Sequence, residues 1–118
     1  MSHDMLSESM QRCIDLCRRC HEACLGMFLR HCVKVGGKHV APDHARLMID
    51  CAIICQTAAD FMTSGSHFHA RVCGVCADVC EACAKSCGEL DGMESCVRAC
   101  SDCAASCREM SGSLQNER

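Results

Sequence analysis

Cysteine is the residue type in this sequence that can take part in the widest range of chemistry. Sixteen of the 118 residues are Cys, well above the roughly 8–10% that marks chains built around cysteine. A thiolate can bind a soft metal ion, form a disulfide or act as a nucleophile. All but one of these cysteines belong to CxxC or CxxxC pairs. They are Cys13, Cys17, Cys20 and Cys24; Cys51 and Cys55; Cys73, Cys76, Cys80, Cys83 and Cys87; and Cys96, Cys100, Cys103 and Cys107.

The alternating steps of three and four residues predict helices. Residues at this spacing share one face of an α-helix, whereas the two-residue period of a strand would scatter them over both faces. Turn residues interrupt the pattern at Gly36-Gly37 with Pro42, at Ser64-Gly65-Ser66, and at Gly88 with Asp91-Gly92. We therefore predict helices over residues 4–35, 43–63, 67–88 and 92–111, with Gly112 ending the last one.

Short connections between four helices favour an all-α fold, an antiparallel up-down-up-down four-helix bundle with a Cys-lined core. We expect the whole chain, 1–118, to form this single domain. Leu, Ile, Val and Phe together make up only about 18% of the chain, a low share for a packed core. Sulfur should therefore occupy the space that large aliphatic side chains normally fill. Cys32 alone lies off the four faces, which leaves open whether it is a ligand at the end of the core or does not bind.

Histidines and methionines extend the same faces. His31 and His44 lie toward one end of the bundle and His69 toward the other, and each is a candidate ligand for an ion entering the core. The methionines at these ends, Met10, Met62 and Met110 or Met27, Met48 and Met93, are core fillers or weak ligands for a soft metal ion. The remaining histidines, His3, His21, His39 and His67, are predicted to be surface residues.

Two interpretations of the cysteines without a metal are weak. Cys would leave a core under-filled if it served only as a small apolar residue, because cavities are costly. Disulfides pin loops in small secreted domains, but these cysteines lie in regular helices. The first residues, Met1 to Glu8, contain no basic stretch followed by an apolar one, so we expect a cytoplasmic protein with reduced thiols.

Metal binding is the interpretation we favour, and Cu(I) is the expected ion. Soft sulfur ligands select Cu(I), Zn(II) or iron–sulfur clusters. A continuous ladder of sulfurs does not divide naturally into the separate tetrahedra that zinc prefers, and the Cys-Pro of ferredoxin motifs is missing. One Cu(I) per thiolate would also leave the buried core close to neutral. The alternatives are a zinc or cadmium buffer of metallothionein type, a thiol–disulfide redox protein and an iron–sulfur electron carrier.

Composition excludes several other classes. With no Trp or Tyr, three Phe and a net charge of −3, the chain has neither stacking platforms nor a basic surface for nucleic acid. It contains no apolar run long enough to span a membrane. Apolar residues outside the Cys faces, among them Leu29 and Ile53, suggest a surface buried in a homo-oligomer.

The four Cys-lined segments, with Met and His at their ends, resemble the cytosolic type of copper storage protein. The stretch from Ser66 to Ala84, SHFHARVCGVCADVCEACA, carries the resemblance most clearly, and the resemblance covers roughly residues 10–110. It implies a non-enzymatic protein that stores many Cu(I) ions through Cys pairs, with His and Met at a mouth. It also implies a homotetramer and a role in copper homeostasis or detoxification, with a copper chaperone as a candidate partner.

Overall fold

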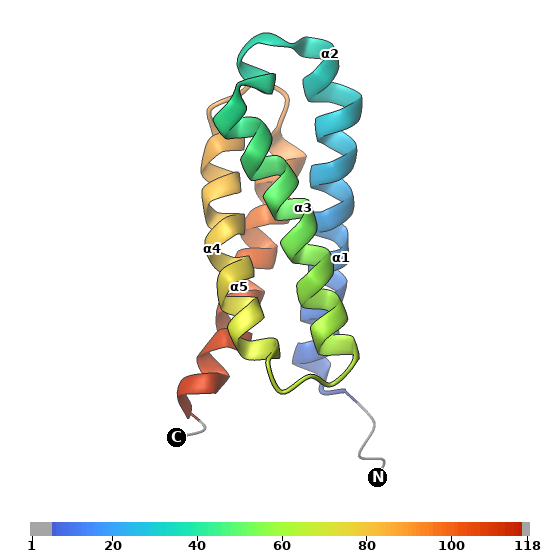
Figure 1. Ribbon diagram of the computed structural model, residues 1–118, viewed down its shortest axis with the longest axis vertical. Coiled ribbons are helices and arrows are strands. Elements are labelled where there is room, and N and C mark those ends of the chain that lie inside the picture. Colours follow the sequence, from blue (N-terminus) through green and yellow to red (C-terminus); the bar gives the residue numbers. More distant parts are fainter. Residues whose placement is uncertain (1–5, 117–118) are drawn as a thin grey trace.

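The computed structural model describes residues 6–116, with side chains through residue 112, and every regular element in this part of the chain is a helix. The elements are α1 (Glu8–Met27), the π-helix η1 (Phe28–Cys32), α2 (Val33–Val35), the 3-10 helix η2 (Gly37–Val40), α3 (Pro42–Thr63), α4 (His69–Gly88) and α5 (Glu94–Asn116). The four long helices run side by side, and consecutive ones are antiparallel (Figure 1). The predicted up-down-up-down bundle is confirmed.

Neighbouring helices close a ring around the core. Helix α1 packs against α3 and α5, and α4 packs against the same two helices. The bundle is elongated, with extents of 52 × 25 × 18 Å, so its core is long and narrow. Over the described residues, no helix has the length and apolar character needed to cross a membrane.

Two helix ends differ from the prediction. Helix α1 begins at Glu8 because the Ser7 hydroxyl accepts a hydrogen bond from the Met10 backbone N–H at 3.1 Å; the predicted start at residue 4 lies outside the described residues. Helix α5 continues through Gly112 to Asn116. A glycine ends a helix when it turns left-handed, and Gly112 is not among the glycines with a positive φ.

A π-helix interrupts the first predicted helix and corrects the placement of Cys32. Residues 28–32 make the wider π turn, which adds about one residue to the register relative to an α-helix. Cys32, rather than His31, therefore lies on the same side of the helix as Cys24. Cys32 is 0% exposed, so the prediction that it lies off the Cys faces is wrong.

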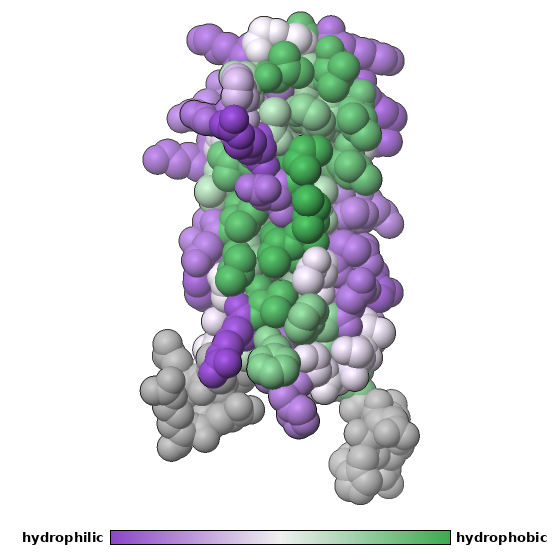
Figure 2. All heavy atoms as spheres, in the orientation of Figure 1, coloured by the Kyte–Doolittle hydropathy of each residue, from purple (hydrophilic) through white to green (hydrophobic). Residues whose placement is uncertain are grey.

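Exposed apolar side chains gather where α1, its extension and α3 meet. Figure 2 shows that apolar side chains continue from here over α3 and onto α4. We define the apolar band by its most exposed members, Leu29, Val33, Val35 and Ile53, each more than half exposed. An apolar surface of this kind marks an interaction site in many proteins.

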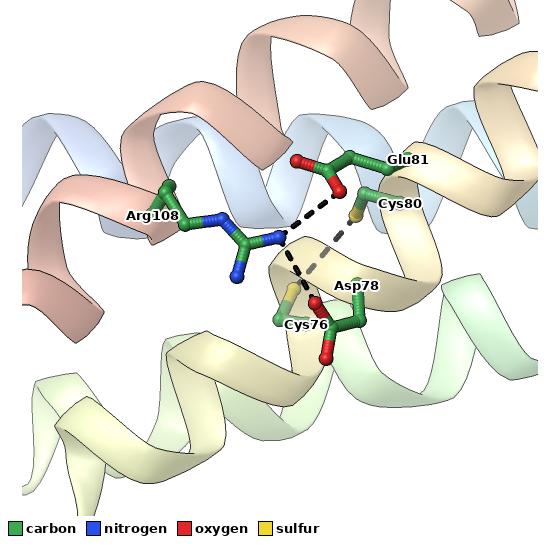
Figure 3. A network of polar contacts seen from close by, with 5 residues as sticks. All are labelled: Cys76, Asp78, Cys80, Glu81 and Arg108. Carbon is green, nitrogen blue, oxygen red and sulfur yellow. Dashed lines mark hydrogen bonds and ion pairs between the residues drawn. The ribbon is translucent and has the colours of Figure 1, made fainter.

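A surface ion-pair network ties α4 to α5. The Arg108 guanidinium lies 2.9 Å from Asp78 and 3.0 Å from Glu81 (Figure 3). These carboxylates raise the pKa of Arg108. Exposed ion pairs contribute little to stability, so burial of the core, here Cys76 and Cys80 beneath the network, must hold the helices together.

The connection between α4 and α5 supports a test with two glycines. Gly92 has φ +77°, and a Cβ built there would lie 3.1 Å from His31 Nε2, whereas Gly88 has open space around it. We expect Gly92→Ala to lower the free energy of unfolding by about 1–2 kcal/mol. Gly88→Ala should leave it unchanged or raise it by about 0.5–1 kcal/mol. Denaturant unfolding of the reduced apo-protein measures both, and equal effects would contradict the assigned turn geometry.

Candidate metal centre

The core of the bundle is a column of sulfur. All sixteen cysteines are free and 0% exposed. Their sulfurs contact one another across helices at 3.5 Å in the pairs Cys17–Cys107, Cys24–Cys100 and Cys55–Cys80. Such distances are far longer than the roughly 2.05 Å of a disulfide. The column consists of separate thiols brought together by four helices.

Within the column the sulfurs form compact groups rather than an even ladder. In each group all sulfurs lie within 4.8 Å of one another. There are three groups of four and one of three: Cys17, Cys76, Cys103 and Cys107; Cys20, Cys24, Cys51 and Cys100; Cys20, Cys55, Cys80 and Cys103; and Cys13, Cys73 and Cys107. The column divides only in part, because Cys20, Cys103 and Cys107 are each shared between two groups. Each group of four draws on three or four helices, so its packing cannot be read from one helix face.

The end of the bundle near His44 has a different ligand set, and we call it the His44 end. The Cys32 sulfur lies 3.8 Å from His44 Nε2 and 3.7 Å from the Met93 sulfur. Cys87 and Cys83 contact the Met48 sulfur at 3.4 and 3.7 Å. At this end, thioether and imidazole groups take the places that further thiols occupy in the middle.

His44 is held so that one ring nitrogen faces the sulfurs. Its Nδ1 is hydrogen-bonded to the Ser86 hydroxyl at 2.7 Å, which leaves Nε2 toward Cys32. Burial lowers the pKa of His44 below its ordinary value, so the imidazole is neutral at neutral pH. A neutral imidazole is the form that binds a metal ion.

The other candidate histidines lie in two different environments. The His31 ring packs edge-on against His39 with centroids 5.4 Å apart, and its Nε2 is buried with no protein partner among the described residues. His39, predicted to be a surface residue, is buried, and its Nε2 donates to the Asp91 carbonyl at 3.0 Å. No sequence pattern signalled this, because the 3-10 turn η2 folds His39 back toward the α4–α5 connection.

His69 lies at the opposite end of the bundle, together with Met10 and Met62, and we call this the His69 end. The ring is partly buried, and Nδ1 donates to the Ser66 carbonyl at 2.9 Å, at the start of its own helix. His21 is also partly buried and donates to the Ala52 carbonyl at 2.7 Å. His67 is exposed as predicted, and His3 lies outside the described residues.

One thiol at each end of the column, Cys32 and Cys73, has a pKa above its ordinary value. Burial raises the pKa of Cys32. For Cys73, the contact with Cys107 lowers the pKa, but the contact with Cys13 and burial outweigh it and raise the pKa to about 12. Such thiols carry their proton at neutral pH, and a metal ion must displace it.

Surface cavities reach the column at the His44 end. A cavity of about 430 Å³ is lined by His44, Ser86 and Glu89, and one of about 510 Å³ has Cys87 and Met93 in its lining. At the His69 end, the cavities of about 250 and 300 Å³ are lined by residues including Arg12, Ser106 and Glu109, without a sulfur ligand. Among these cavities, only those at the His44 end offer sulfur or imidazole to an approaching ion.

Comparison with known proteins agrees with this geometry. A family model described as copper storage protein matches residues 6–112. The crystal structure of the Nmul_A1745 protein from Nitrosospira multiformis is 56% identical, with a TM-score of 0.88 over 89% of this chain and 96% of that one. The Cu(I)-bound copper storage protein BsCsp3 is 36% identical, with a TM-score of 0.80 over 88% of this chain and 99% of that one.

A protein of Bacillus subtilis is also similar to this chain in amino-acid sequence. The uncharacterized cysteine-rich protein YhjQ of Bacillus subtilis is 35% identical over 86 residues, which is 73% of this chain and 79% of that protein. The family match spans almost all of the described residues, including all sixteen cysteines. This chain therefore belongs to the copper storage protein family.

Proposed function

We propose that this protein binds and stores multiple Cu(I) ions through the thiolates of its core. The observation that carries the proposal is the column of sixteen free, fully buried thiols, with sulfurs 3.5–3.8 Å apart across helices. A Cu(I) ion replaces a thiol proton without changing the charge, so a filled column stays close to neutral, whereas uncompensated buried charge is strongly unfavourable. A similar structure, BsCsp3, is Cu(I)-bound, which supports the choice of ion.

All sixteen cysteines are proposed ligands, joined by His44, His31 and His69 at the two ends. The support is strongest for His44, because its Nε2 already faces the Cys32 sulfur. His31 is supported by a buried Nε2 without a protein partner among the described residues. His69 is the weakest candidate because one of its nitrogens is engaged with the Ser66 carbonyl. We propose that copper enters at the His44 end, where the cavities reach ligands.

Anaerobic titration of the reduced apo-protein with Cu(I), against a Cu(I) chelator of known affinity, tests the function. We expect capacity to approach one ion per cysteine, close to sixteen. Tight binding of only one or two ions would exclude storage.

Competition between Zn(II) and Cu(I) on the apo-protein tests the metallothionein-type alternative, and a preference for zinc would favour it. Counting the free thiols of the protein under nitrogen tests the redox alternative. A count close to sixteen would argue against a redox-active disulfide.

The pH dependence of copper binding follows from the thiol pKa values. Each Cu(I)–sulfur bond displaces a proton from a thiol such as Cys32, whose pKa burial raises. Affinity should therefore increase about tenfold per pH unit for each proton displaced, up to the thiol pKa. Chelator competition at pH 6.5 and 7.5, corrected for protonation of the chelator, measures the change. An affinity that does not depend on pH would show that the thiols bind without deprotonation.

We further propose that the protein acts in the cytoplasm as a single, non-catalytic bundle domain. It would either release stored copper for use or protect the cell from excess copper. Reduced thiols on this scale are compatible with a reducing compartment. A copper chaperone is a candidate donor. A strain lacking the protein should show impaired growth at high copper, and the phenotype should be rescued by the wild-type chain but not by one whose core cysteines are replaced by serine.

The apolar band supports a homo-oligomer, and we propose a tetramer. Leu29 and Ile53 are 56% and 59% exposed, and a charge on such residues would oppose burial of the band against another copy. We expect Leu29→Asp with Ile53→Asp to yield a smaller species in sedimentation analysis. Ser101→Asp with Ala105→Asp, two exposed positions on α5 away from the band, is the matched control. A monomeric wild-type chain would contradict the proposal.

A further inference from the structure

We propose that the apo-protein also binds two divalent d10 ions, Zn(II) or Cd(II), in two preformed tetrathiolate sites inside the column. This inference concerns a second class of metal ion, and it does not depend on the Cu(I) proposal. It rests on how the sulfur groups are spaced and on which cysteines they share.

The spacing matches a tetrahedron around a metal ion. Zinc–sulfur bonds of about 2.3 Å place the sulfurs of a regular tetrahedron roughly 3.8 Å apart. In the first group, the Cys17 sulfur lies 3.5 Å from Cys107 and 3.6 Å from Cys103, and Cys103 lies 3.9 Å from Cys107. These edges need only small shifts of side chains to close on an ion.

The second group has the same dimensions. The Cys100 sulfur lies 3.5 Å from Cys24, 3.7 Å from Cys20 and 3.8 Å from Cys51, and Cys20 lies 3.6 Å from Cys51. All four sulfurs are fully buried. This group is drawn from α1, α3 and α5, so an ion here would join three helices.

Shared cysteines limit the number of simultaneous sites to two. The first and second groups have no cysteine in common. The third group of four shares Cys20 with the second and Cys103 with the first, and the group of three shares Cys107 with the first. Two isolated tetrathiolate ions can therefore form together, and a third cannot form without a bridging sulfur.

Charge makes these sites weaker than Cu(I) sites. Each divalent ion displaces four thiol protons and forms a tetrathiolate of net charge −2, which is costly to bury. Cys55 and Cys80 lie between the two groups and belong to neither. As thiols, they can donate S–H hydrogen bonds to sulfurs of the two groups. Cys80 lies 3.7 Å from Cys51, and Cys55 lies 3.8 Å from Cys103. Cu(I) avoids the charge altogether, so it should displace the divalent ions.

Co(II) is the probe for the test, because tetrahedral Co(II) bound to four thiolates has intense visible absorption bands. The reduced apo-protein is titrated anaerobically with Co(II), and Zn(II) is then added to displace it. We expect saturation at two equivalents in the wild-type chain. Adding Cu(I) should abolish the bands.

Two sets of variants make the test specific. Cys20→Ser removes two of the three groups of four and leaves one, so one equivalent is expected; Cys20→Ser with Cys103→Ser removes all three, and the tetrathiolate bands should vanish. The matched control is Cys87→Ser with Cys96→Ser, because neither residue belongs to a group, and it should still bind two equivalents.

The two double variants lose the same number of thiols, so their Cu(I) capacities should fall equally. Absence of tetrathiolate bands in the wild-type chain, or equal Co(II) binding by the two double variants, would overturn the inference. Either result could occur while Cu(I) capacity stays near sixteen, which would leave the proposed function intact. A low Cu(I) capacity with normal Co(II) binding would instead contradict the proposed function.

Discussion

Replacing the ligands at the His44 end should slow Cu(I) uptake about tenfold or more while hardly changing how much copper the protein holds. The variant combines Cys32→Ser, His44→Ala and Cys87→Ser. In the wild-type chain, Cys32 and His44 face each other at 3.8 Å, and Cys87 has a place in the lining of a surface cavity. An ion that loses this first set of soft ligands must cross the end of the bundle without them. A barrier higher by about 1.4 kcal/mol is enough for a tenfold slower rate.

The measurement is anaerobic stopped-flow transfer of Cu(I) from a chelator complex, followed by loss of the complex's absorbance. The matched control places the same three replacements at the His69 end: Cys13→Ser, His69→Ala and Cys73→Ser. Both variants lose two thiols, so their capacities should fall by about two ions each. Slower uptake in the control variant than in the His44-end variant would place the route of entry at the other end.

Filling the column with Cu(I) should raise the melting temperature of the bundle by more than about 20 °C. Among the residues whose side chains the structure describes, the apo core contains only four large, fully buried side chains, Ile14, Met48, Met62 and Met93, which lie among small residues. Bound ions would link sulfurs on different helices, and any ligand that binds only the folded chain stabilises it by mass action. At a thousandfold excess over Kd, one site contributes about 4 kcal/mol, and each kcal/mol shifts the melting temperature by about 4–8 °C in a domain near this size.

Thermal unfolding followed by far-ultraviolet circular dichroism, under nitrogen and with a reductant, measures the shift. The control is the loaded protein after a high-affinity chelator has removed its copper, which should melt like the apo-protein. If loaded and apo-protein melt together, the ions do not cross-link the helices, and binding would have to occur outside the core.

Much of this fold could be predicted from the sequence because it depends on local periodicity. The three- and four-residue steps of cysteines such as Cys73, Cys76 and Cys80 can bury one face only in a helix, and short connections make consecutive helices antiparallel. The family resemblance rested on the same residues. Burial of the Cys faces could be predicted without knowing which helices face each other.

Other features depended on contacts between helices. The π turn moves Cys32 into the core and turns His31 aside, and no residue in Phe28–Cys32 marks such a turn in advance. His39 becomes buried because η2 returns to the α4–α5 connection, where Asp91 accepts its hydrogen bond. A regular α-helical pattern assumes a constant number of residues per turn, so one wider turn shifts every later position.

The grouping of sulfurs was decided only by the tertiary structure. A single helix places Cys20 and Cys24 on one face, but their tetrahedral partners, Cys51 and Cys100, come from α3 and α5. The relative height of the helices along the bundle axis determines these distances, and that height follows from packing among all four helices rather than from spacing within any one. The sequence by itself determined that sulfur fills the core; only the packed bundle decided which sulfurs can bind the same ion.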